Sequence, residues 1–146
     1  MVGNVIHVRA DVDPMAQPRH KIGAGRRAYL PRKVQERLFV YKSGLVSAFI
    51  CKYGRLPVVP KGVPVTLSLT FEIPMAASWS EKRKLAKEGT FHTSVPDADN
   101  LAKAVQDALC PKILYDDAQV AVLSVVKYWA RTGSVEILIK QEGGNG

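Results

Sequence analysis

The sequence VTLSLTFEI at residues 65–73 alternates apolar and polar side chains along its whole length. This alternation is typical of a β-strand that buries one face and leaves the other in water. Such a strand is stable only within a sheet that another layer of the protein covers. The segments on either side must therefore supply further strands and helices.

The segments before this strand predict one more strand and a long helix. Residues Val5–Val12 also alternate, which indicates a half-buried strand that ends at Asp13-Pro14. Residues 15–30 contain glycine and proline and are typical of a loop or an extended arm. From Pro31 to the residue before Gly54 we expect a helix, because apolar residues recur at steps of three and four. They are Val34, Leu38, Tyr41, Leu45 and Ala48, with Phe39, Val46 and Ile50 widening the face. This helix is expected to be buried over much of its girth.

The segments after the strand predict two more helices and two more strands. Ser78, with Glu81 three residues later, forms a capping-box pattern that opens a short basic helix over Trp79–Lys87. An apolar stripe within residues 101–109 predicts another helix, which Pro111 ends. Residues 119–129 and 134–140 then have the composition of two strands, with Gly133 in the turn between them.

This order of elements predicts a single α+β domain with a mixed or antiparallel sheet packed against helices. The 146 residues and 16.0 kDa are the usual size of one domain, and the 47% apolar content is ordinary for a globular fold. We place the domain at residues 1–141 and expect a flexible C-terminal tail at residues 142–146.

The sequence argues against a membrane protein. No stretch approaches the roughly 18 apolar residues that a membrane span requires. Charged residues interrupt the first apolar run, so it does not have the form of a secretory signal. We therefore expect a cytoplasmic protein with no membrane partner.

The net charge of +8 is unevenly distributed. No acidic residue occurs between Asp13 and Glu36, so the segment from Arg19 to Lys33 creates a positive field of the kind that attracts nucleic acid. The alternative is a basic face that only aids solubility. The candidate DNA-binding residues are Arg19, Lys21, Arg26 and Arg27 in this segment and Lys82, Arg83, Lys84 and Lys87 in the short helix.

Five aspartates gather in a short part of this basic chain. They are Asp97, Asp99, Asp107, Asp116 and Asp117. Crowded carboxylates repel one another and favour a bound cation, and Mg²⁺ prefers oxygen ligands. Lys103 follows Asp99 by four residues, which places its ammonium on the same side of a helix, near the phosphate that a metal would polarise.

Each of these residues also has a purely structural explanation. Asp99 is suited to capping the following helix, and Asp97 is suited to a turn. The pair Asp116-Asp117 fits a polar turn between a helix and a strand. Lys103 and Asp99 fit a surface ion pair that stabilises a helix by a few tenths of a kcal/mol.

The combination of motifs resembles the RusA-type Holliday junction resolvases, which are small endonucleases that are often encoded by phages or prophages. The resemblance lies in residues 96–103, with the sequence PDADNLAK, in Asp107-Ala108-Leu109, and in residues 116–120, with the sequence DDAQV. It implies a homodimer of α+β subunits that binds a four-way DNA junction and cuts two opposed strands in recombination and repair. It also implies Mg²⁺ as the cofactor, with Mn²⁺ as a substitute, and no organic cofactor.

The resemblance also assigns roles to residues. The essential carboxylates correspond to Asp97, Asp99 and Asp117, which would be both catalytic residues and metal ligands. The essential lysine corresponds to Lys103, and Asn100 and Asp116 would have supporting roles. The segment Cys110-Pro111-Lys112 departs from the glycine-containing link of the family, and this departure affects the expected metal geometry and the preferred cleavage sequence.

Two other functions compete with this hypothesis. A RusA-like fold would also suit the cleavage of other branched DNA, such as flaps. A non-catalytic, basic nucleic-acid-binding domain would use the same Arg19–Lys33 segment and would not need the aspartates.

Overall fold

The computed structural model describes residues 4–18, 21–23, 25 and 28–143. The elements are β1 (Val5–Ala10), β2 (Lys21–Ile22), β3 (Ala28–Tyr29), α1 (Arg32–Tyr53), β4 (Val65–Pro74), α2 (Glu81–Lys87), α3 (Ala98–Leu109), the 3₁₀ turn η2 (Asp117–Gln119), β5 (Val120–Ala130) and β6 (Ser134–Gln141). None of the described helices combines the length and the apolar character needed to cross a bilayer.

The strand over residues 65–74, β4, lies inside a four-stranded sheet of order β1-β6-β4-β5. It pairs antiparallel with β6 and parallel with β5, and β1 pairs antiparallel with β6. The mixed sheet and the α+β class predicted from the sequence are therefore confirmed. A separate hairpin, β2–β3, lies within the segment predicted to be an arm.

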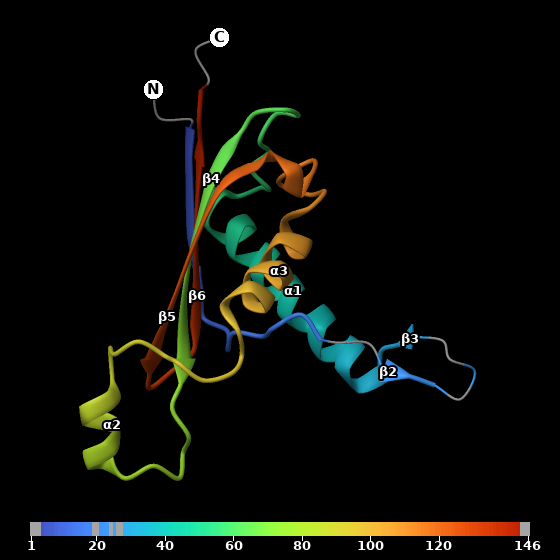
Figure 1. The fold of residues 1–146 in the computed structure, drawn as a ribbon. Coiled ribbons are helices and arrows are strands. Elements are labelled where there is room, and N and C mark those ends of the chain that lie inside the picture. The colour runs from blue at the N-terminus through green and yellow to red at the C-terminus, as the bar shows by residue number, and fades with distance from the viewer. Residues whose placement is uncertain (1–3, 19–20, 24, 26–27, 144–146) are drawn as a thin grey trace.

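Helices α1 and α3 cover one face of this sheet, and α2 stands apart near one end of it (Figure 1). The alternation in β4 has the predicted effect, since Leu67, Leu69 and Phe71 are almost completely buried. They share one core with Phe49 of α1 and Val105 of α3. Each of the two helices thus contributes one apolar face to a single hydrophobic layer.

Helix α1 is less buried than its sequence pattern predicts. Leu38, Tyr41 and Leu45 are buried, as expected. Phe39 and Ile50, however, are 63% and 45% exposed, so the helix is not buried over much of its girth within one chain. The helix lies on one face of the sheet, so its opposite side remains exposed in the described part of the chain.

The start of α2 also differs from the sequence-based prediction. Ser80, and not Ser78, is its N-cap, because the Ser80 hydroxyl accepts a hydrogen bond from the Arg83 amide at 3.2 Å. The helix consequently begins at Glu81, two residues later than predicted.

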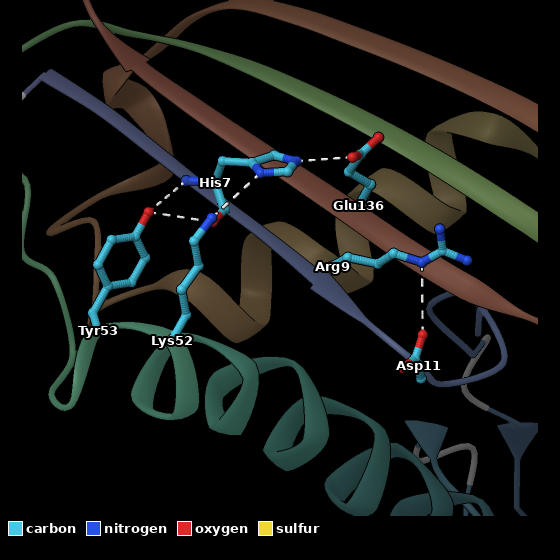
Figure 2. Close-up of polar contacts among 6 residues, drawn as sticks. All are labelled: His7, Arg9, Asp11, Lys52, Tyr53 and Glu136. Carbon is cyan, nitrogen blue, oxygen red and sulfur yellow. Dashed lines mark hydrogen bonds and ion pairs between the residues drawn. The ribbon is translucent and has the colours of Figure 1, made fainter.

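The C-terminal end of α1 covers the outer edge of β1 (Figure 2). The His7 amide donates to the Tyr53 hydroxyl at 2.9 Å, and Lys52 Nζ donates to the His7 carbonyl at 2.6 Å. The His7 ring also contacts Glu136 of β6 at 2.8 Å. A further strand cannot pair with β1 at this position, since both backbone groups of His7 are occupied.

The predicted tail begins with ordered contacts. The Glu142 amide donates to the Pro64 carbonyl at 2.8 Å, and the Thr66 hydroxyl donates to the Glu142 carboxylate at 2.7 Å. Residues 144–146 of the tail lie outside the described residues.

Gly133, in the turn between β5 and β6, is required by a close approach of two segments. A Cβ atom at this position would lie 2.8 Å from the Asp13 Cα and even closer to its carboxylate. We expect Gly133→Ala to lower the free energy of unfolding by about 1–3 kcal/mol, since backbone would have to move. Urea denaturation measures this change. Gly25→Ala is the matched control, because no atom of the described residues lies within 4 Å of its added methyl group. Equal stability of the two variants would contradict the prediction.

Candidate active site

Asp97 and Asp99 project from the start of α3, the helix that crosses over between the parallel strands β4 and β5. The apolar stripe predicted in this segment is buried, including Leu101 and Val105, so the opposite face of α3 is turned to solvent. Asp97 is the N-cap residue, and its side chain makes no capping hydrogen bond to a described residue. Both carboxylates are exposed. The capping explanation therefore does not account for Asp99, which lies inside the first turn.

Lys103 is exposed one helical turn beyond Asp99, as the spacing predicts. Among the described residues these two side chains form no ion pair within 4.0 Å. Asn100 is half-buried, and its carbonyl accepts a hydrogen bond from the Gln17 amide at 3.0 Å. Gln17, which precedes the basic segment Arg19–Lys33, thus packs against the first turn of α3.

Asp116 and Asp117 form a second carboxylate pair, in the turn that follows α3. Asp116 caps this turn, because its carboxylate accepts a hydrogen bond from the Ala118 amide at 3.0 Å. Gln119 is buried and fastens the turn to the loop before β4, donating to the carbonyls of Pro60 at 2.9 Å and Val63 at 3.0 Å. The polar-turn explanation therefore holds for Asp116, while the Asp117 carboxylate is exposed.

The two carboxylates of this pair have pKa values displaced in opposite directions. The hydrogen bond from the Ala118 amide lowers the pKa of Asp116. The pKa of Asp117 is raised, first by its hydrogen bond with Asp116 and then by partial desolvation and the negative charges of Asp116 and Asp107. Such a pair holds one proton more readily than two separate carboxylates, as expected where negative charges crowd without a cation.

The two carboxylate pairs lie on opposite sides of α3 in the chain, Asp97 and Asp99 at its start and Asp116 and Asp117 in the 3₁₀ turn that follows its end. Figure 1 shows the course of this helix. Asp117 is within electrostatic reach of Asp107, which is two turns, or about 12 Å, further along the helix than Asp99. No group of three or more His, Cys, Asp or Glu side chains in the described part of the chain is close enough to hold a metal ion. The three predicted ligands Asp97, Asp99 and Asp117 are therefore not brought together within a single chain.

Lys127 of β5 approaches the start of α3 and is absent from the sequence-based predictions. Its Nζ donates to the carbonyls of Ser94 at 3.0 Å and Pro96 at 2.9 Å, in the loop that leads to Asp97. The signal in the sequence is that Lys127 is the one charged residue of the mostly apolar strand β5.

An aromatic cluster connects this loop with α2. The ring of His92, which is buried, lies 4.3 Å from the ring of Trp129, and that of Trp79 lies 4.8 Å from Trp129. The Arg83 guanidinium stacks on Trp79 at 3.7 Å. Because α2 has no buried residue of its own, these contacts help to attach it to β5.

The basic residues of α2 are largely available to a ligand. Lys82, Arg83 and Lys87 are exposed and Lys84 is half-buried. Arg131 engages Glu81 at 2.7 Å and Glu88 at 2.8 Å, so the two acids of this region are neutralised by a residue outside the helix. In the other basic segment, Arg19, Arg26 and Arg27 lie outside the described residues, and only the backbone of Lys21 is described.

The pKa of His92 reflects both its burial and the nearby charge of Lys127. Burial, followed by the positive charge of Lys127, lowers the pKa of His92 below 6.5. The neutral ring is thus favoured in the folded state, so stability is complete above about pH 6.5 and declines as the pH falls from there toward the lower folded pKa. We expect NMR titration to give a His92 pKa below 6.5 and His92→Phe to remove this part of the pH dependence of unfolding. A His92 pKa at or above 6.5 would contradict the described burial.

Comparison with known proteins adds a family match. The model of the family described as Endodeoxyribonuclease RusA matches residues 11–140, which include both carboxylate pairs and Lys103. The uncharacterized protein YqaN of Bacillus subtilis (strain 168) is 37% identical over 82 residues. This match covers 53% of the chain and 58% of YqaN, so the chain spans little more than half the length of this curated relative.

Proposed function

The chain belongs to the RusA family of endodeoxyribonucleases, and on this premise we propose that it is a divalent-metal-dependent nuclease that cuts four-way DNA junctions. Its role would be the resolution of Holliday junctions in recombination and repair. The observation that carries this proposal is the exposed pair Asp97 and Asp99 at the start of α3, with Lys103 one turn beyond. Among the residues that the structure describes, neither carboxylate has a hydrogen-bond or ion-pair partner that would explain its position.

Mg²⁺, with Mn²⁺ as a substitute, suits this set of donors because both ions prefer carboxylate oxygen. We propose Asp97, Asp99 and Asp117 as its ligands, with Asp116 and Asn100 supporting them. When bound, such an ion polarises a phosphodiester and lowers the pKa of a bound water. Lys103 would stabilise the negative charge that develops on the phosphate. The basic residues of the segment Arg19–Lys33 and of α2 would bind the DNA backbone through phosphate contacts, which carry no sequence information.

Replacing Asp99 tests this assignment. Asp99→Asn keeps the size of the side chain and removes its charge, so we expect an unchanged circular dichroism spectrum and a loss of Mg²⁺-dependent junction cleavage by at least about two orders of magnitude. Junction binding should persist or tighten, because a negative charge near the phosphates is removed. The measurement is cleavage of a labelled four-way junction with and without EDTA.

Asp11→Asn provides the control for this experiment. Asp11 is also an exposed aspartate, at the end of β1, and it contacts Arg9 at 3.6 Å. It should cleave like the wild type. Near wild-type cleavage by Asp99→Asn would show that the site is assigned wrongly.

A homodimer is part of the same proposal, since two opposed strands must be cut and each chain carries one set of these residues. Exposed apolar side chains on two elements provide the candidate contact surface. They are Phe39, Val40 and Ile50 on α1 and Val122 and Leu123 on β5. Strand β5 directly follows the turn that carries Asp117. Phe39 of α1 lines a cavity of about 250 Å³ together with Asp107, whose charge acts on Asp117.

A dimer formed on this side would also explain the separation of the two carboxylate pairs. A two-fold axis perpendicular to α3 makes the two copies of this helix antiparallel, so the start of one helix approaches the end of the other. We therefore propose that Asp97 and Asp99 of one subunit act with Asp117 of the other.

Mixing two inactive variants tests this arrangement. Asp99→Asn and Asp117→Asn should each be inactive alone. In a mixed dimer, one site would carry both substitutions and the other site would carry neither, so mixing at equal amounts should restore about one quarter of the wild-type sites. The product should be nicked rather than doubly cut junctions. Exchange between differently tagged wild-type subunits is the control, and no gain of activity despite exchange would mean that each site is built within one chain.

A non-catalytic nucleic-acid-binding domain remains the second candidate, favoured by the lack of an assembled three-carboxylate group among the described residues. It predicts retention of branched DNA with and without Mg²⁺ and cleavage in neither condition.

A further inference from the structure

Lys127 occupies a position of β5 that faces the core. In the parallel register it lies beside Phe71 of β4, which is fully buried, and on the same side of the sheet as α3. Its neighbours on this face of β5 are Val125 and Trp129. A half-buried ammonium at such a position is unfavourable unless hydrogen bonds replace the water that it loses.

These hydrogen bonds come from one short loop. Lys127 Nζ donates to the carbonyls of Ser94 and Pro96, and among the described residues no carboxylate lies within ion-pair distance of it. The Pro96 carbonyl belongs to the peptide group that joins Pro96 to Asp97. The ammonium is therefore separated from the Asp97 backbone by a single peptide unit.

The rest of the loop has few other attachments. At its start, the His92 amide donates to the Lys127 carbonyl at 3.0 Å, and at its end the Leu101 amide donates to the Asp97 carbonyl at 3.0 Å. Between these points residues 93–96 form no regular element. Lys127 thus holds both ends of this connection, the start through its backbone and the approach to Asp97 through its side chain.

We propose that Lys127 is a positioning residue, whose ammonium fixes the loop before α3 and so fixes the placement of the Asp97 carboxylate relative to Asp99. The assignment rests on the proposed function for the role of Asp97, while the attachment of the loop is independent of it. Removal of the ammonium leaves two carbonyls unpaired and frees the loop to move. A displacement of about 1 Å at a reacting group is enough to slow a reaction by up to about a hundredfold.

The test compares three variants. Lys127→Met keeps the length of the side chain and removes its donors, and Lys127→Arg keeps a charged group with several donors. Lys140→Met is the matched control, because Lys140 also lies on a strand, is exposed, and contacts only the nearby Glu142 at 3.8 Å in the described structure. Steady-state junction cleavage with substrate in excess over enzyme gives kcat and KM. Hydrogen exchange followed by mass spectrometry gives the protection of residues 93–99.

We expect Lys127→Met to lower kcat by about tenfold to a hundredfold with KM nearly unchanged, because DNA binding depends on other residues. Exchange in residues 93–99 should become faster in this variant only. Lys127→Arg should recover most of the loss in kcat, and Lys140→Met should match the wild type.

Two results would overturn the assignment: unchanged loop protection in Lys127→Met, or a loss of kcat that arginine does not restore. If the wild type cleaves no junction, the proposed function fails, and the exchange comparison still decides whether Lys127 holds the loop.

Discussion

The parallel pairing of β4 with β5 is the constraint on which the rest of the structure depends. Two successive parallel strands cannot be joined by a hairpin, so the chain must leave the sheet and return along its face. Helix α3 makes this return, and its Leu101 and Val105 belong to the same hydrophobic core as the buried residues of β4. One carboxylate pair lies where the chain enters α3, and the other lies in the turn between α3 and β5.

One helix consequently serves the core and the candidate site together. Its buried stripe fixes its rotation on the sheet, and this rotation turns Asp99 and Lys103 to solvent. Lys127 of β5 binds the loop that leads into α3. Gln119 binds the loop before β4 and so fixes the turn that follows α3. The positions of the two carboxylate pairs therefore depend on these attachments of the connecting loops to the rest of the fold.

The two edge strands of the sheet, β1 and β5, differ in how their free backbone groups are covered. At β1, Lys52 and Tyr53 occupy the backbone groups of His7, which prevents the addition of a strand there. At β5, the bridge between Phe91 and Tyr128 covers only the end of the strand. The rest of this edge begins beside Asp117 and carries the exposed side chains of Val122 and Leu123, which belong to the contact surface proposed above.

The sequence by itself determined the four strands of the main sheet, the two long helices and the candidate residues, because periodicity and short motifs act over a few neighbouring positions. It did not reveal the β2–β3 hairpin. The alternation in residues 65–73 matches β4 to within one residue, and the stripe in residues 101–109 lies within α3, which begins three residues earlier. Tertiary structure decided which strands pair, which side of α1 remains exposed at Phe39 and Ile50, and that Lys127 reaches the loop before Asp97. It also decided that the turn carrying Asp117 lies near Asp107, at the other end of α3 from Asp97 and Asp99. These features depend on contacts between residues far apart in the chain, for which a local pattern carries no information.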